Sequence, residues 1–130
     1  MLQVTAAVIE RDGLVLIARR RAGGRFGGVW EFPGGKVEPG EEPRDGLRRE
    51  IREELDLAID IGACLGEYPF ASPSFSLVLI AFRAGIRGGV PVLHDHDEMA
   101  WVRPAELAGY TFAEPDLPLV ERLRQEAAHG

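Results

Sequence analysis

The 130-residue chain of 14.2 kDa, with 45% hydrophobic and 28% charged residues, has the composition of an ordinary globular protein, and we expect one domain over residues 1–130. Its apolar runs are shorter than the roughly 18 residues of a membrane span, its start lacks the basic segment of an export signal, and its single cysteine, Cys64, fits a reducing cytoplasm. The formal charge of −6 argues against binding to a nucleic acid polymer, so we expect a small anionic ligand, bridged to the acidic chain by cations.

The first third of the chain predicts short strands separated by glycine-rich turns. Two apolar, β-branched runs flank the turn at residues 11–13, a pattern typical of a β-hairpin. A later short strand should stop at Pro33 and the two glycines after it, because proline and glycine interrupt regular pairing. In chain order, we expect strands over residues 2–9 and 14–19, a basic glycine-rich loop over 20–28, a strand over 29–32 and an extended connection over 36–43.

Residues 43–55 have the periodicity of an amphipathic helix. Pro43 suits the first turn of such a helix, where its missing N–H would have no partner. Leu47, Ile51 and Leu55 recur at i, i+4 and i+8, so this stripe should pack inward.

Three glutamates occupy a different face of the same helix. Glu50, Glu53 and Glu54 stand at i, i+3 and i+4, which brings their carboxylates together. Exposed like charges at these spacings repel by roughly 0.2–0.5 kcal/mol per pair, and more where water is excluded. Taken alone, such a charge run usually indicates a solvated helix face.

The second half of the chain adds strands and a closing helix. We expect strands over 57–67, 75–83 and 99–102, a turn over 85–89, and a last amphipathic helix over 114–128. This mixture of strands with two helices indicates a compact α+β or α/β sandwich. The sequence fits either a monomer or a homodimer.

The segment from Gly35 to Leu57 resembles the signature box of the Nudix hydrolases. That box is a glycine, five residues, a glutamate, seven residues, Arg-Glu, an aliphatic residue, any residue, Glu-Glu, any residue, glycine and an aliphatic residue. The chain departs from it at Asp56, where the family has glycine. The matching residues are Gly35, Glu41, Arg49, Glu50, Ile51, Glu53, Glu54 and Leu57.

Beyond the box, the stretches WEFPGGK, HDHDEMAWV and PDLPL resemble MutT-type nucleoside triphosphate pyrophosphohydrolases, especially members that act on cytidine nucleotides. The resemblance implies a Nudix-type α/β/α sandwich with a mixed β-sheet and a loop-helix-loop motif. It also implies hydrolysis of a nucleoside triphosphate to monophosphate and pyrophosphate, as in cleaning of the nucleotide pool. Two alternatives stay open: hydrolysis of another diphosphate-linked nucleotide, such as ADP-ribose or a dinucleoside polyphosphate, and a non-catalytic module that binds nucleotides.

The acidic helix face predicts a divalent-metal site. Carboxylates are the oxygen ligands that hard cations prefer, so we expect Mg²⁺ as cofactor, with Mn²⁺ as a substitute. His94 and His96 flank Asp95 and form an alternative histidine clip, although alternating residues also arise by chance. The expected metal ligands are Glu50, Glu53, Glu54, Asp95 and, as the family implies, the Gly34 carbonyl.

The expected reaction also needs residues that move a proton and hold the ligands in place. Glu53 or Glu50 should accept the proton of the attacking water. Arg49 should orient a carboxylate by charge-assisted hydrogen bonds, and Glu41 should support Arg49 or the metal cluster. Gly35 should let the backbone approach the site closely.

The remaining candidates would contact the substrate. Arg20 and Lys36 are expected phosphate ligands. An ionised Asp116 only accepts hydrogen bonds, which suits the exocyclic amine of a cytosine-type base, whereas a protonated Asp116 could donate and would undo this argument. This residue is also a good cap for the last helix. The aromatic candidates for contact with the base are Trp30, which core packing would equally explain, Phe32 and Phe70.

Overall fold

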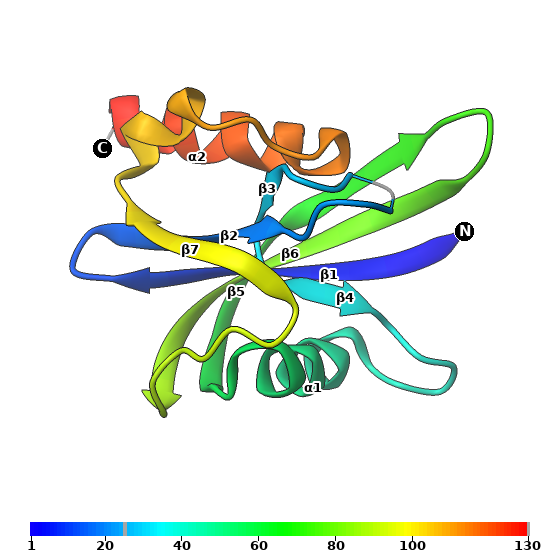
Figure 1. Cartoon of the computed structure of the whole chain (residues 1–130), viewed down its shortest axis with the longest axis horizontal. Coiled ribbons are helices and arrows are strands. Elements are labelled where there is room, and N and C mark those ends of the chain that lie inside the picture. Colours follow the sequence, from blue (N-terminus) through cyan, green and yellow to red (C-terminus); the bar gives the residue numbers. More distant parts are fainter. Residues whose placement is uncertain (25, 130) are drawn as a thin grey trace.

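The computed structural model describes residues 1–24 and 26–129 and confirms the expected α/β/α sandwich with a mixed sheet (Figure 1). The loop expected over 20–28 includes Arg25, and the domain expected over 1–130 includes Gly130; both residues lie outside the described part. None of the helices in the described residues is long and apolar enough to cross a membrane. The elements are β1 (Leu2–Arg11), β2 (Leu14–Arg20), β3 (Trp30–Glu31), β4 (Gly34–Lys36), α1 (Pro43–Leu55), β5 (Ala58–Ala71), β6 (Ser76–Gly88), β7 (His96–Val102), the 3₁₀ helices η1 (Pro104–Gly109) and η2 (Glu114–Asp116), and α2 (Leu117–His129).

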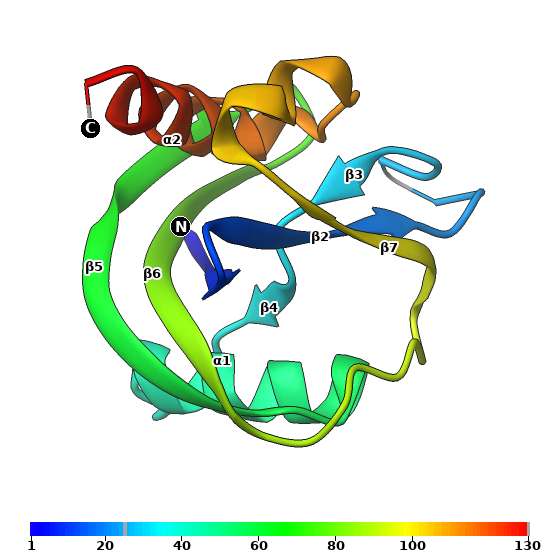
Figure 2. The ribbon, with the colours of Figure 1, turned by 90° about the vertical axis from the view of Figure 1, so that its left-hand side faces the viewer.

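Strand β1 lies at the centre of the sheet, and its surroundings explain its apolar sequence. It pairs in parallel with β6 along residues 2–9 and antiparallel with β4 at residues 4–6. Helix α1 covers one side of the sheet and α2 the other, so residues 6–9 are buried on both faces and form a continuous apolar run. Figure 2 shows β5 and β6 curving past β1 from the α2 side to the α1 side.

Strands β1 and β2 form the expected hairpin but separate soon after its turn. They pair at Glu10–Val15 and Arg11–Leu14, after which β2 pairs with β7 and β3. Strand β4 takes the place beside β1 that β2 leaves, and the Ala7 N–H donates to the Pro33 carbonyl at 2.8 Å. A space therefore opens between β1 and β2.

Helix α1 has the predicted bounds and the predicted inward stripe. Leu47, Ile51 and Leu55 have no exposed surface and pack with apolar residues of β1, β5 and β6. Because this stripe is fixed against the sheet, two carboxylates of the neighbouring face, Glu50 and Glu54, are directed toward the opening between β1 and β2.

Two residues of α1 that are unusual for a helix have local explanations. Gly46 is buried, and a Cβ there would lie 2.9 Å from Glu41 Oε1, so the absent side chain leaves room for that carboxylate. Asp56 ends the helix in the left-handed region, with φ 57° and ψ 30°, and its N–H donates to the Arg52 carbonyl at 3.1 Å. This conformation costs roughly 1–2 kcal/mol for a residue with a Cβ, although aspartate is among the residues that adopt it.

One strand was missed and one expected turn was wrong. The strand expected over 29–32 does end before Pro33, at Glu31, but Gly34–Lys36 then pair with the edge of β1 as β4. The turn expected over 85–89 is strand instead as far as Gly88, because Ile86 pairs with Ile59 of β5.

Other elements are longer than expected, or were missed. Strand β5 continues to Ala71, and β7 begins at His96 because that residue pairs with Arg20. The 3₁₀ helix η1 was not predicted, and the first three residues of the expected last helix form the separate 3₁₀ helix η2.

The packing of α1 predicts a large loss of stability from one truncation. Ile51→Ala should lower the free energy of unfolding by about 2–5 kcal/mol, because it removes a fully buried side chain and leaves a cavity. Urea unfolding measures this, with Arg52→Ala, an exposed neighbour on the same helix, as the control. A loss no larger than that of the control would show that the stripe does not anchor the helix.

Candidate active site

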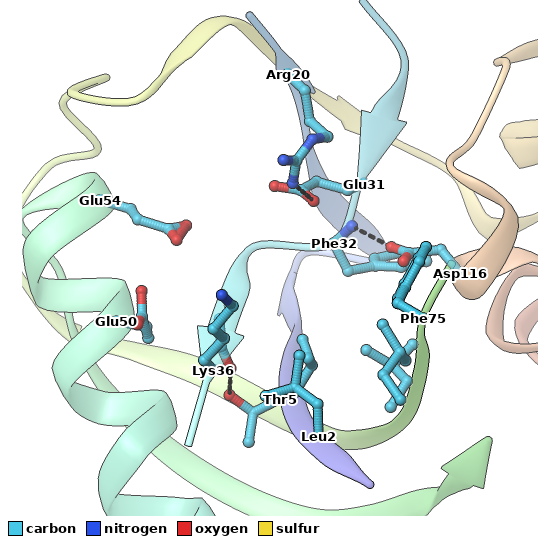
Figure 3. Close-up of a pocket in the computed structure, with 15 residues that line it drawn as sticks. Leu2, Thr5, Arg20, Glu31, Phe32, Lys36, Glu50, Glu54, Phe75 and Asp116 are labelled. Carbon is cyan, nitrogen blue, oxygen red and sulfur yellow. Dashed lines mark hydrogen bonds and ion pairs between the residues drawn. The ribbon is translucent and has the colours of Figure 1, made fainter. Parts of the chain in front are cut away.

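A cavity of about 540 Å³ lies where β1 and β2 separate (Figure 3). Figure 3 shows Glu50 and Glu54 reaching toward it from α1 on one side, with Asp116 and Phe75 on the opposite side. Its two ends therefore differ in chemistry, one acidic and one aromatic. The lining residues are Leu2, Val4, Thr5, Phe32, Gly34, Gly35, Phe75, Leu77 and Leu79, with Arg20, Glu31, Lys36, Glu50, Glu54 and Asp116 as the charged members.

A second, smaller cavity of about 290 Å³ adjoins the acidic end. It shares Arg20, Glu31, Gly34 and Glu54 with the first cavity and adds Asp95. The fold thus brings together four predicted site residues, Arg20, Gly34, Glu54 and Asp95, from four separate parts of the sequence.

Arg49 is the centre of an ion-pair network on the loop and helix of the box. It donates two hydrogen bonds to Glu41, at 2.9 and 3.0 Å, one to Glu50 at 3.0 Å and one to the Lys36 carbonyl at 3.0 Å. The hydrogen bond to Arg49 is the main reason why the pKa of Glu41 is lowered to about 2. Glu53 approaches Arg49 at 3.4 Å, but its side chain is 57% exposed and lines neither cavity.

Glu54 is the buried acidic residue of the site. It is only 7% exposed, and its Oε1 has no hydrogen-bond partner among the described residues. Burial, followed by the negative charges of Glu31, Glu50 and Asp95, raises its pKa to about 9, against a smaller lowering by a hydrogen bond from the Gly34 backbone. A divalent cation would give Oε1 a partner and favour the ionised carboxylate, so the residues here fit such an ion.

Glu50 stands beside Glu54 at the cavity wall and depends on the glycine of the box. A Cβ on Gly35 would lie 2.4 Å from Glu50 Cδ, so only glycine leaves space for this carboxylate. Burial raises the pKa of Glu50 despite its hydrogen bond with Arg49. Thr5 Oγ1 holds the same strand by donating to the Gly35 carbonyl at 3.1 Å.

Side chains alone would not fill the coordination shell of a metal ion, so backbone oxygens, waters or substrate oxygens would supply the other ligands. Within residues 1–24 and 26–129, no three Asp, Glu, His or Cys side chains are grouped closely enough to hold an ion. Mg²⁺ is commonly bound by one or two carboxylates together with substrate phosphates and waters, and Glu54 with Glu50 could supply the carboxylates.

The two histidines of the HDHDE stretch point to different partners. His94 Nε2 lies 2.9 Å from Asp56 Oδ2, whereas His96 is buried and its Nε2 lies 2.8 Å from Glu31 Oε2. The structure therefore does not bring them together as a clip around Asp95.

Glu31 is a site residue that the sequence reasoning missed. Besides His96, it accepts a hydrogen bond from Arg20 Nη1 at 2.8 Å, and it lines both cavities. The available signal was a charged residue inside the short apolar strand over 29–32. Its effect on Glu54 and Asp116, whose pKa values it raises, places it between the two ends of the site.

Asp116 occupies the end of the cavity opposite the glutamates. Its Oδ2 accepts a hydrogen bond from the Phe32 N–H at 2.9 Å, across the fold, so the carboxyl is not simply a cap of α2. Burial, followed by the charge of Glu31, raises its pKa to about 8, against smaller effects of the Phe32 hydrogen bond and Arg20. The ionised form assumed from the sequence is therefore the minor form at neutral pH.

The aromatic candidates divide between the cavity and the core. Phe32 lines the cavity and stacks on Phe112 at a ring distance of 5.3 Å. Phe70 and Trp30 line neither cavity; Trp30 packs against Tyr110 at 5.2 Å. Phe75, which the sequence reasoning missed, lines the cavity and lies 5.5 Å from Phe70.

Comparison with known proteins agrees with the acidic helix and the sandwich around it. The model of the NUDIX domain matches residues 1–123 of the chain. The chain belongs to the Nudix family and is a hydrolase of that family, whose members generally use divalent metal ions.

Individual relatives extend over most of the chain. The CTP pyrophosphohydrolase of Escherichia coli (strain K12) is 39% identical over 121 residues, which cover 93% of this chain and 90% of the relative. The putative 8-oxo-dGTP diphosphatase 2 of Mycobacterium tuberculosis (strain ATCC 25618 / H37Rv) is 38% identical over 107 residues, covering 80% and 74%. The solution structure of the E. coli ORF135 protein has a TM-score of 0.86 and 37% identity, covering 99% of this chain and 92% of that chain. The MutT protein of Methanosarcina mazei Go1 has a TM-score of 0.84 and 28% identity, covering 97% and 94%.

The burial of Glu54 predicts a pH-dependent effect of its neutral analogue on the metal-free protein. Because its pKa is raised from 4.5 to about 9, the folded carboxyl holds its proton more tightly than the unfolded one. The contribution of this carboxyl to the stability of the wild type should therefore be largest below pH 4.5 and decline as the pH rises toward 9. Glu54→Gln removes this decline and should raise the free energy of unfolding at pH 9 by about 1–3 kcal/mol.

Urea unfolding in EDTA at pH 5, 7 and 9 measures the effect. Glu53→Gln, on the same helix but exposed, should change stability little at each pH and serves as the control. Equal stability of Glu54→Gln and the wild type at pH 9 would show that burial of the ionised Glu54 carboxylate does not destabilise the fold.

Proposed function

We propose that the chain hydrolyses nucleoside triphosphates to a nucleoside monophosphate and pyrophosphate, in a reaction that needs Mg²⁺ or Mn²⁺, with preference for a cytosine-type base. The observation that carries the proposal is that one cavity has the carboxylates of Glu50 and Glu54 at one end and Asp116 with Phe32 and Phe75 at the other. Such a cavity suits a ligand with phosphates at one end and a base at the other. The names of the relatives, a CTP pyrophosphohydrolase among them, support this substrate class.

The acidic end would hold the divalent ions. Glu54 and Glu50 are the residues that we assign to the metal, with the Gly34 backbone and Asp95 completing the side next to the smaller cavity. An ion held there would supply positive charge to the phosphoryl oxygens and to the leaving pyrophosphate, and would lower the pKa of a water molecule bound to it.

The remaining polar residues would hold the phosphates and take up a proton. Arg20 and Lys36 line the cavity and supply positive charge for the phosphate chain. Glu50 lines the cavity while Glu53 does not, so we place Glu50 ahead of Glu53 as acceptor of the proton from the attacking water. Arg49, fixed by Glu41, keeps the Glu50 carboxylate in one orientation.

At the other end, a protonated Asp116 suits cytosine for a different reason than the ionised form. A neutral carboxyl group donates one hydrogen bond and accepts others. Cytosine offers N3 as acceptor beside the N4 amino donor, so the two groups are complementary. Guanine can also meet a neutral carboxyl, through O6 as acceptor and N1–H as donor, but its adjacent N1–H and N2–H donors fit an ionised carboxylate as well, which cytosine N3 does not.

A panel of nucleotides with Mg²⁺, analysed by chromatography, tests the function. CTP and dCTP should give monophosphate and pyrophosphate faster than GTP, dGTP, ADP-ribose and a dinucleoside polyphosphate. Glu54→Gln should lose most of the turnover while remaining folded, and Asp60→Asn, a remote exposed carboxylate, should keep it. Release of orthophosphate from every triphosphate, or no turnover by the wild type, would refute the proposal.

Base preference should depend on pH through Asp116. As the pH rises through about 8, the carboxyl ionises and loses its donor, so the ratio of kcat/KM for CTP to that for GTP should fall. The expected fall is roughly 2- to 10-fold, the equivalent of one net hydrogen bond. Using the ratio cancels pH effects on the acidic end, which both substrates share.

Asp116→Asn gives a matched test, because an amide donates and accepts at every pH. Its CTP-to-GTP ratio should be constant from pH 6.5 to 9, whereas Asp60→Asn should follow the wild type. A wild-type ratio that does not change across this range would exclude Asp116 as the group that reads the base.

A further inference from the structure

The segment over residues 89–95 crosses the C-terminal end of α1 and satisfies its last carbonyl groups. The Val92 N–H donates to the Leu55 carbonyl at 2.9 Å, and the His94 N–H donates to the Glu54 carbonyl at 3.2 Å. Carbonyls in the last turn of a helix have no partner within the helix, so an external donor is needed. Through these bonds the backbone of the segment is attached to the residue that carries the buried carboxylate.

A side-chain pair joins the same two parts of the chain. His94 Nε2 donates to Asp56 Oδ2 at 2.9 Å, because a carboxylate can only accept. Asp56 provides its carboxylate from a left-handed conformation, φ 57°, that glycine would adopt more easily. On the other side, Arg21 Nη2 donates to the His94 carbonyl at 2.6 Å. His94 is thus held at its ring, its N–H and its carbonyl.

Asp95 follows His94 directly and lies in the smaller cavity with Glu54. Hydrogen bonds that fix the residue next to a metal-binding carboxylate restrict where the carboxylate oxygens can lie. Fixing His94 therefore restricts the position that Asp95 can take relative to Glu54.

We propose that Asp56 and His94 form a latch that holds residues 89–95 against the end of α1 and positions Asp95 beside Glu54 for metal binding. The inference rests on the proposed function, since that proposal assigns Asp95 to the metal side of the site. Asp56 and His94 are positioning residues in this scheme and do not contact the substrate.

The first test removes the carboxylate without straining the backbone. Asp56→Gly should preserve the fold and thermal stability, because glycine readily adopts the left-handed conformation. Calorimetric titration should show binding of Mn²⁺ to the nucleotide-free protein weakened by about 3- to 10-fold. This loss is smaller than the loss expected for a residue that bonds a metal ligand directly, because Asp56 acts on Asp95 only through the backbone. Hydrogen exchange at the Val92 and His94 amides should become faster.

Matched variants separate the latch from a general change in stability. Asp12→Gly relieves the same kind of left-handed conformation, φ 54°, in an exposed turn and should leave Mn²⁺ binding unchanged. Asp56→Asn keeps an acceptor for His94 Nε2 and should restore most of the affinity. His94→Ala should reproduce the loss, and the double variant with Asp56→Gly should be no worse than either single one, as expected for residues acting together.

The two proposals can fail separately. Unchanged Mn²⁺ affinity and unchanged amide exchange in Asp56→Gly would overturn the latch, whatever the wild type hydrolyses. Lack of nucleotide turnover by the wild type would overturn the proposed function but would not alter the exchange and Mn²⁺ measurements.

Discussion

The constraint on which the site depends is the placement of two carboxylates, Glu50 and Glu54, at the wall of one cavity. The helix that carries them has a fully buried apolar side, which fixes the direction of the neighbouring face. Arg49 offsets part of their repulsion and, through Glu41 and the Lys36 carbonyl, ties the loop before α1 to the helix. The remaining cost falls on Glu54, whose pKa is raised by burial and by the neighbouring negative charges, and whose Oε1 has no hydrogen-bond partner within the described residues.

The separation of β1 from β2 opens the cavity that the acidic face of α1 lines. This cavity has an acidic end and an aromatic end, with Glu31 between them. Arg20 and His96 each bind one oxygen of Glu31, so a single carboxylate connects β2, β3 and β7 at the wall. Its charge raises the pKa of both Glu54 and Asp116, so the two ends are electrostatically coupled although they are far apart in sequence.

Local periodicity in the sequence predicted the helix correctly, whereas strands and site residues that depend on contacts with distant parts of the chain were missed. The bounds of α1 and its inward stripe followed from periodicity. Strand β4 and the continuation of β6 did not, because each exists through pairing with a strand elsewhere in the chain. Glu31 and Phe75 were missed for the same reason, and the protonated state of Asp116 could not be read from its neighbours because burial is a property of the folded chain. His94 and His96 are separated by one residue in the sequence, but their side chains bind different partners, Asp56 and Glu31.

The parallel pairing of β1 with β6 also governs how the molecule is made. Val4 pairs with Leu79, so the central strand of the sheet cannot be completed until most of the chain has left the ribosome. Contacts between residues so far apart in sequence make folding slow, since the long intervening loop must close before they form. The acidic helix is therefore synthesised before β5 and β6, which join β1 in burying its inner side. The cavity also includes Asp116, so all of its lining residues are present only when nearly the whole chain has been made.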